Sequence, residues 1–202
     1  MRILFSSLSA YGHTYPLLPL AVAARDAGHE ITFATGDEFH PTMEALGFEA
    51  VSAGMSVFDA LNAAFAADPE NDEDTDLQQL TQEQSTRGAA MMFGSVLPRR
   101  FIDDIGRILA RPGGFDLVVY EAANLGAALA AQRAGIPAVC HGFGRSGGGI
   151  DEERIQGLLS ALAAEFDLDV EFDGMIFSKN PYLDIYPPSL QDPTFLGAPN
   201  RV

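Results

Sequence analysis

Two side chains that can move a proton follow the ends of two strand-like segments. His13 lies in the loop after RILFSS (residues 2–7), and Glu121 ends DLVVYE (residues 116–121). A histidine can remove the proton of an attacking hydroxyl, and a neighbouring carboxylate orients the ring and stabilises the imidazolium that forms. The alternative is that His13 hydrogen-bonds within its loop and Glu121 caps the next helix. Spacing alone favours neither.

The elements that must bring these residues together alternate between strands and helices. Short strands are predicted at residues 2–7, 30–36, 49–54, 116–121, 138–143 and 183–188. Helical segments lie between most of them, which predicts an α/β fold with a doubly wound, mostly parallel sheet and helices on both faces. If the strand order is 3-2-1-4-5, the ligand crevice opens between the first and fourth strands at their carboxyl ends. His13 and Glu121 then face each other across it.

The helices carry recognisable start and stop signals. The first has an apolar face at helical spacing, prolines near its start and Gly28 after its end. A second helix is expected over residues 124–134, and a longer one over 88–110 with a kink at Pro98. A further helix is expected after the glycines at 147–149.

The segment between the third strand and the long helix is acidic. Six of the nine positions from 68 to 76 are Asp or Glu, which predicts a mobile, solvated loop over about residues 67–87. The carboxylates loosely follow the spacing of a calcium loop, but Glu73 stands where that loop needs glycine for its turn. No metal site is therefore predicted.

Glycine-rich segments give little support for a bound nucleotide cofactor. The first strand-to-helix loop contains Gly12 but no GxGxxG, which disfavours an NAD-type oxidoreductase. The glycines at 147–149 precede Asp151, Glu152 and Glu153, and these carboxylates would repel a phosphate from the helix N-terminus. We expect a connector there and no cofactor.

The composition limits the partners and the compartment. The 202 residues, 47% of them hydrophobic, suit one globular domain. The formal net charge of −16 disfavours nucleic acid and anionic membrane surfaces. No apolar run approaches the roughly 20 residues of a membrane span, and no signal-peptide pattern is present, so we expect a cytoplasmic protein. Cys140 is expected to be a buried structural thiol. The sequence leaves open whether the protein forms a homodimer.

Aromatic and methionine side chains near the crevice and the acidic segment are candidates for an apolar acceptor pocket. They are Tyr11, Met55, Phe58, Phe65, Met92 and Phe93. Side chains of this kind at helical spacing are more often plain core. His141, at the end of the fifth predicted strand, can reach the same crevice.

Much of the chain resembles one enzyme family. The likeness begins with GHTYPLLPLAVAARDAGHEITFAT, and it continues through ALGFEAVSAGM, DLVVYEAANLGAALAAQRAGIPAVCHGFGR and NPYLDIYPPSLQDP. These segments resemble the N-terminal half of GT-B-fold glycosyltransferases of antibiotic and macrolide biosynthesis, especially the enediyne type. The likeness fails only around the acidic segment. It implies a single Rossmann-like acceptor-binding domain over residues 1–202.

The resemblance also implies an inverting transfer without a metal. Such enzymes join an acceptor domain to a C-terminal domain that holds a nucleotide sugar, commonly a dTDP deoxysugar, and they glycosylate a hydrophobic natural product. Gly12 and Thr14 are the candidates for contacts with the donor. The chain ends at APNRV, about where a linker is expected. The donor-binding domain is therefore expected to be absent, and the chain is expected to be inactive by itself.

Position by position, the resemblance assigns roles to the residues of the crevice. His13 matches the catalytic base, and Glu121 stands where many members have the partnering aspartate. His141 and Phe143 match a strand end that contributes to the acceptor pocket. A second interpretation stays open, in which the chain is a non-catalytic accessory or ligand-binding protein of the same fold.

Overall fold

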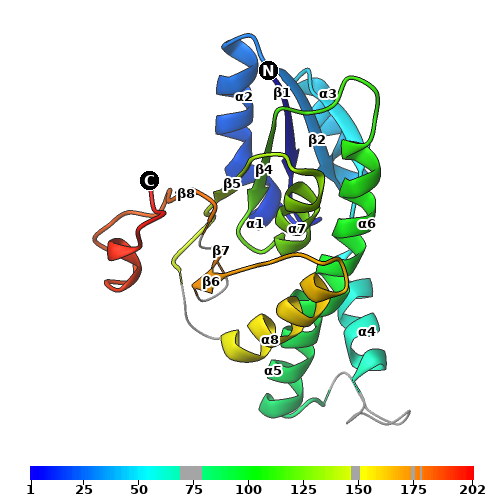
Figure 1. The fold of residues 1–202 in the computed structure, drawn as a ribbon, viewed down its shortest axis with the longest axis vertical. Coiled ribbons are helices and arrows are strands. Elements are labelled where there is room, and N and C mark those ends of the chain that lie inside the picture. Colours follow the sequence, from blue (N-terminus) through cyan, green and yellow to red (C-terminus); the bar gives the residue numbers. More distant parts are fainter. Residues whose placement is uncertain (69–78, 147–150, 174–175, 178) are drawn as a thin grey trace.

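The strands form one parallel sheet whose winding reverses between β1 and β4. The structure is a computed structural model that describes residues 1–202 except 69–78, 147–150, 174–175 and 178. Its six-stranded sheet has the order β3-β2-β1-β4-β5-β8, and every neighbouring pair is parallel. The chain builds outward from β1 to β3, then returns to lay β4 against the other side of β1 (Figure 1). The predicted α/β class, doubly wound sheet and order 3-2-1-4-5 are confirmed.

The strands begin close to the predicted positions, and the last one is much shorter than predicted. Their bounds are β1 (Arg2–Ser6), β2 (Glu30–Thr35), β3 (Glu49–Ser52), β4 (Leu117–Glu121), β5 (Ala138–His141) and β8 (Tyr182–Leu183). The prediction of a strand over 183–188 was wrong. Asp184 accepts hydrogen bonds from the Tyr186 N–H and the Gln191 amide, which turns the chain away from the sheet. A separate antiparallel pair joins β6 (Phe172–Asp173) and β7 (Ile176–Phe177).

Helical segments connect the strands. They are α1 (Tyr11–Thr14), η1 (Tyr15–Leu17), α2 (Leu18–Asp26), η2 (Asp37–Phe39), α3 (His40–Ala45), α4 (Val57–Ala67), α5 (Gln82–Met91), η3 (Met92–Val96), α6 (Leu97–Leu109), α7 (Leu125–Ala134), α8 (Glu152–Ala164) and η4 (Phe195–Gly197). The first predicted helix is thus a run of three joined segments. Gly28 follows it with φ +88°, a backbone conformation that glycine adopts without steric cost.

Apolar side chains cover both faces of the sheet, as the near-continuous hydrophobic strands require. On one face, Phe5 and Phe33 pack with Met43 of α3 and Leu17 of η1. On the other face, residues of α6 and α7 such as Phe101 form a larger core. That core extends into α4, α5 and α8, which project beyond the carboxyl ends of the strands in Figure 1.

The acidic loop predicted over residues 67–87 extends too far at its C-terminal end. The helix α5 begins at Gln82, because the side chains and backbone N–H groups of Thr81 and Gln84 form a reciprocal capping box. Arg87 of α5 makes an ion pair with Asp68 at the end of α4. The carboxylates at 70–76 that loosely follow the calcium-loop spacing lie outside the described residues.

The helix predicted over 88–110 changes its winding before Pro98. The π-helical segment η3 links α5 to α6, and a Cβ on Gly94 there would come within 3.0 Å of Leu158 side-chain atoms on α8. This glycine therefore permits the close approach of the two helices. Pro98 has no N–H to donate to the preceding turn, and it lies just after η3, where the winding of this continuous helical run changes.

Candidate active site

The loop after β1 is held by a buried network of hydroxyl groups. Ser7 Oγ lies 2.9 Å from Thr14 Oγ1 and 3.2 Å from Thr35 Oγ1, and Thr14 Oγ1 donates a hydrogen bond to the Leu8 carbonyl oxygen at 3.0 Å. All three hydroxyl side chains are buried. The network fixes the short helix α1 over the end of β1, and with it the backbone of His13.

Glu121 joins the two strand ends that border the crevice. Its side chain is fully buried. Oε1 accepts a hydrogen bond from the Leu8 N–H at 3.3 Å, and Oε2 accepts one from the Ala123 N–H at 2.7 Å. Leu8 follows β1 and Ala123 follows β4, so one carboxylate ties both loops together. A buried carboxylate is stabilised when it accepts such bonds.

His13 meets this carboxylate from α1. Its Nδ1 lies 3.3 Å from Glu121 Oε1, and its side chain stays 22% exposed. The Nδ1 atom itself is buried and makes no hydrogen bond of good geometry with the described residues, so a small rotation of the ring is needed to align it. Because Nδ1 faces the carboxylate, Nε2 is the ring nitrogen left for a ligand.

The pKa of His13 reflects two opposing influences. Burial is the largest single influence and favours the neutral ring, but the contact with Glu121 and the negative charge of that carboxylate together outweigh it. The pKa of His13 is therefore raised above its ordinary value. Glu121 thus stabilises the imidazolium, the charge state that a histidine base reaches after taking a proton.

The end of β5 brings two further predicted residues to this site. His141 is paired with Glu121 across the β4–β5 ladder and is only 3% exposed. Phe143 lies beyond the strand end, with its ring centroid 4.5 Å from that of His13, and is 38% exposed. The structure therefore brings His13, Glu121, His141 and Phe143 together.

The other acceptor-binding candidates divide into exposed and buried groups. Tyr11 and Phe58 are about 70% exposed, and Met55 and Phe93 are half-buried at the edge of the larger core. Tyr11 packs edge-to-face against Tyr15 and Phe39, which hold its ring at the surface. Neither Phe65 nor Met92 contributes such a surface. These two belong to the hydrophobic core, and their prediction as acceptor-binding residues is corrected.

The two donor-binding candidates beside His13 also differ. Gly12 is exposed, and a Cβ built on it would meet nothing within 4 Å. Thr14 is fully buried and its hydroxyl serves the loop network. The prediction of Thr14 as a donor contact is therefore corrected, because its side chain points into the protein.

Sequence reasoning missed a buried asparagine that borders the site. Asn124 caps α7 by accepting a hydrogen bond from the Ala127 N–H at 3.3 Å, and its amide donates to Ser6 Oγ at 2.9 Å. It therefore fastens the start of α7 to the end of β1. Its place between a strand end and a helix, where asparagine is a favoured N-cap, was the available signal.

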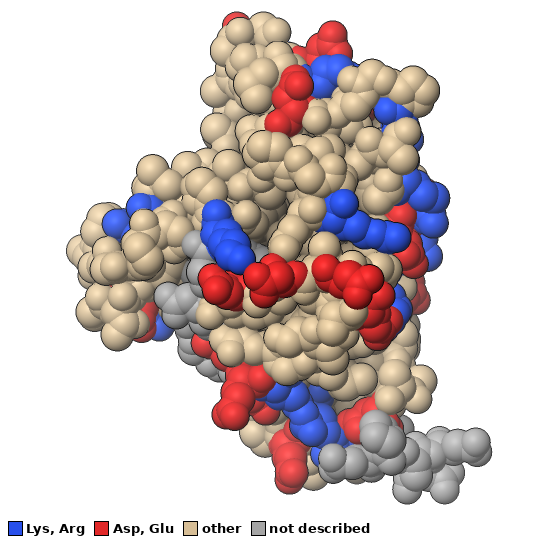
Figure 2. Space-filling view, viewed as in Figure 1, with Lys and Arg blue, Asp and Glu red and all other residues tan. Residues whose placement is uncertain are grey.

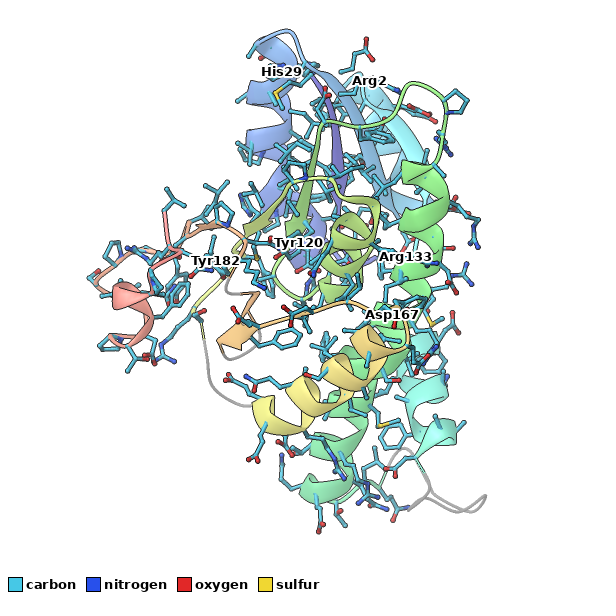
Figure 3. The ribbon with its side chains drawn as sticks, in the orientation of Figure 1. Arg2, His29, Tyr120, Arg133, Asp167 and Tyr182 are labelled. Carbon is cyan, nitrogen blue, oxygen red and sulfur yellow. The ribbon has the colours of Figure 1, made fainter. Side chains whose placement is uncertain are left out.

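The opposite face of the same strands is structural. Figure 3 labels Tyr120 on β4 and Tyr182 on β8, and Cys140 of β5 lies buried in the same core. Burial raises the pKa of the Cys140 thiol well above its ordinary value, so the thiol stays protonated and unreactive. The expectation of a buried structural cysteine is confirmed.

Surface charge, clusters of possible metal ligands and helix length bear on other ligand classes. Acidic and basic side chains are mixed over the face shown in Figure 2, without a continuous basic patch. Among the described residues, no group of three or more His, Cys, Asp or Glu is arranged to hold a metal ion. None of the described helices is long and apolar enough to cross a membrane.

Comparison with known families assigns the chain. Residues 22–194 match the family model described as "Erythromycin biosynthesis protein CIII-like, N-terminal domain". The chain belongs to this family. The glycosyltransferase resemblance predicted from the sequence is confirmed by this match.

Related enzymes are about twice as long as this chain. The L-demethylnoviosyl transferase of Streptomyces niveus is 28% identical over 95% of this chain and 46% of its own length. The aclacinomycin-T 2-deoxy-L-fucose transferase of Streptomyces galilaeus is 28% identical over 67% of this chain and 35% of its own length. The chain is thus related to glycosyltransferases of antibiotic biosynthesis, and it spans less than half the length of these relatives.

Solved structures agree on the fold. A glycosyltransferase of Streptomyces sp. SF2575, also solved in complex with thymidine diphosphate, is 26% identical with a TM-score of 0.66 over 95% of this chain and about half of its own. The calicheamicin glycosyltransferase superposes with a TM-score of 0.72 at 22% identity, over 100% of this chain and 51% of its own. The predicted fold, the N-terminal half of a GT-B enzyme, is confirmed.

Proposed function

We propose that this chain is the acceptor-binding half of an inverting glycosyltransferase, with His13 as the general base and Glu121 as its partner. The donor is a nucleotide-activated deoxysugar, of which a dTDP sugar is the best candidate, and the acceptor is a hydroxyl of a hydrophobic natural product. The observation that carries the proposal is the fully buried Glu121 carboxylate 3.3 Å from His13 Nδ1. It lies at the sheet's switch point, where open α/β sheets bind their ligands.

The transfer is a single displacement in this proposal. The acceptor oxygen bonds to the anomeric carbon as its proton passes to His13 Nε2, and the bond from that carbon to the diphosphate oxygen breaks on the opposite face. The nucleoside diphosphate leaves with the bonding electron pair, and the anomeric configuration inverts. The Glu121 carboxylate orients the ring and stabilises the His13 imidazolium.

The residues around the dyad suit an apolar acceptor. Phe143 contacts the His13 ring and is partly exposed, so an acceptor hydroxyl approaching Nε2 would meet an aromatic wall. Tyr11 and Phe58 add exposed aromatic surface, although the structure does not place either in contact with His13. Aromatic surface beside a polar reacting group is the usual make-up of a small-molecule site.

The donor is proposed to bind mainly to a second domain. The chain matches less than half the length of its curated relatives. Two acidic side chains, Asp37 and Glu38, lie in the turn after β2. A net charge of −16 also opposes the binding of an anionic donor by this half alone.

Two measurements test this function. Titration calorimetry of the chain with thymidine diphosphate should show no tight binding. A dissociation constant in the low micromolar range would contradict the proposal that the donor binds mainly to a second domain. A transfer assay should use the chain joined to the donor-binding half of a related glycosyltransferase, a dTDP deoxysugar and a panel of hydrophobic hydroxylated aglycones. Product formation that depends on His13 supports the proposal. If aglycones bind and His13 variants of an active hybrid lose nothing, the chain is instead a binding module.

A further inference from the structure

His141 lies against the dyad from the neighbouring strand. Glu121 and His141 are register partners in the parallel β4–β5 ladder, and the Ala122 N–H donates to the His141 carbonyl oxygen at 3.0 Å. Side chains of paired residues point to the same face of a sheet. His141 is therefore on the Glu121 face, whereas Cys140 is on the opposite one with Tyr120.

The burial of His141 argues against a direct contact with the acceptor. The residue is 3% exposed, compared with 22% for the His13 side chain. Its Nδ1 is buried and has no hydrogen-bond partner among the described residues. An imidazole enclosed in this way is a costly choice for a core position unless its polarity has a use.

We propose that Glu121 is shared by two histidines, and that His141 is a positioning residue which supports this carboxylate from β5 rather than an acceptor-binding residue. The inference rests on the proposed function, because it concerns the partner of the proposed base. It replaces the role in acceptor binding that the resemblance implies for His141.

The charge state of His141 suits such a role. Burial lowers the pKa of His141 below its ordinary value, and a backbone contact at Gly142 and the negative charge of Glu121 oppose this effect without cancelling it. The ring is therefore neutral at neutral pH. A neutral His141 ring is a polar neighbour of Glu121. Because it carries no positive charge, it does not compete with the His13 imidazolium for the Glu121 carboxylate.

The titratable groups of β8 and the residues after it do not replace this partnership. On β8, Tyr182 is the register partner of Cys140, and Asp184 follows the strand and is paired with Arg201. Burial raises the pKa of Tyr182, so that side chain is neutral too. Glu121 is thus the carboxylic residue paired across the ladder with His141.

The first test measures the histidine pKa values in the chain by NMR, so it needs no catalytic activity. The four histidine signals are assigned with His29→Gln, His40→Gln and His141→Gln variants, and the remaining signal is that of His13. In Glu121→Gln, the pKa values of both His13 and His141 should fall, because the negative charge that raises each is gone. If only the His13 pKa falls, the carboxylate is not shared and the inference is wrong.

The second test separates positioning from acceptor binding in the active hybrid. His141→Leu should lower kcat roughly 10-fold with an unchanged acceptor KM, and His141→Gln, which keeps a polar edge, should recover most of the loss. Cys140→Ala, at the adjacent buried position on the other face, controls for damage to β5 and should keep near-full kcat. A raised KM with unchanged kcat in the His141 variants would return this residue to the acceptor site.

The two tests also separate the inference from the proposed function. Coupled histidine pKa values in a hybrid whose turnover does not depend on His13 would leave the shared carboxylate standing and remove the catalytic role of the dyad. Turnover that depends on His13, together with a His141 pKa that does not change in Glu121→Gln, would support the catalytic role of the dyad and contradict the shared carboxylate.

Discussion

Two histidine–carboxylate pairs in this protein have equally exposed rings but very different carboxylates. The His13 and His40 side chains are each 22% exposed. His13 Nδ1 lies 3.3 Å from Glu121, which is fully buried, whereas His40 Nε2 lies 3.7 Å from Asp37, which is 81% exposed. The first pair spans two strand ends. The second lies within one turn and the start of α3.

The difference shows that a carboxylate's surroundings decide what its histidine can do. Glu121 is fixed by N–H groups from both loops, so it acts at a constant place and with little screening by water. Asp37 is surrounded by solvent, and it accepts a hydrogen bond from Ser52 as well. Exposed pairs of this kind contribute little, because water and salt screen the charges.

The largest expected effect comes from removing the buried pair's base. In the active hybrid, His13→Ala should lower turnover roughly 100- to 10,000-fold while acceptor binding stays nearly intact, because proton removal matters in the transition state. His40→Ala is the matched control and should keep turnover within about 2-fold, in line with the small effect of exposed pairs. Steady-state kinetics and acceptor titration measure both. If the two variants lowered turnover equally, the buried pair would have no special role in the reaction.

Neutralising the two carboxylates should give a smaller contrast. Glu121→Gln keeps the size of the side chain but removes the charge that stabilises the imidazolium, so we expect a loss on the order of 10- to 100-fold. Asp37→Asn should leave the rate unchanged. A double variant, His13→Ala with Glu121→Gln, should be no slower than His13→Ala alone if the pair acts as one unit. An additive loss would show that Glu121 works independently of His13.

The pH dependence sharpens the comparison further. The proposed base works only when neutral, and its pKa is raised, so kcat/KM should increase with pH and reach half its maximum above about pH 6.5. In Glu121→Gln this acid limb should move to lower pH, since the charge that raises the pKa is absent. Asp37→Asn should not move it. If the acid limb of the kcat/KM profile stays in place in Glu121→Gln, it reports the ionisation of a group other than His13.

The smallest effect is expected for an ion pair on the surface. Arg99 and Glu165 form a two-pronged contact between α6 and the end of α8, with both side chains about half exposed. Arg99→Ala should melt at the wild-type temperature within error, as measured by circular dichroism. By contrast, Arg87→Met removes the buried ion pair with Asp68 and should lower stability by about 3–5 kcal/mol. Similar melting temperatures for the two variants would mean that burial does not separate these pairs.

Much of the fold and part of the site could be predicted from local patterns. Short apolar runs separated by amphipathic segments gave five strands, and Gly28 ended its helix as expected. The start of α5 was missed although Thr81 and Gln84 have capping-box spacing. The acidic composition of the preceding segment outweighed that signal.

The residues that failed as site predictions failed because local spacing does not report burial. Phe65 and Met92 have the residue types of a binding pocket, but the packing of α4 and η3 turns them into the core. Thr14 lies next to His13 in sequence and points the other way. Successive residues of a helix face different directions, so proximity along the chain says little about a shared site.

The sequence by itself determined the strand and helix pattern, the acidic charge and the placement of His13 and Glu121 after strand ends, because these depend on residue types and short periods. Only the tertiary structure decided that Glu121 is buried and held by the N–H group of Leu8, and that His141 lies beside it. Those contacts join residues more than 100 positions apart, or lie across a ladder whose register emerges only when the whole sheet packs. Local residue types cannot specify such contacts.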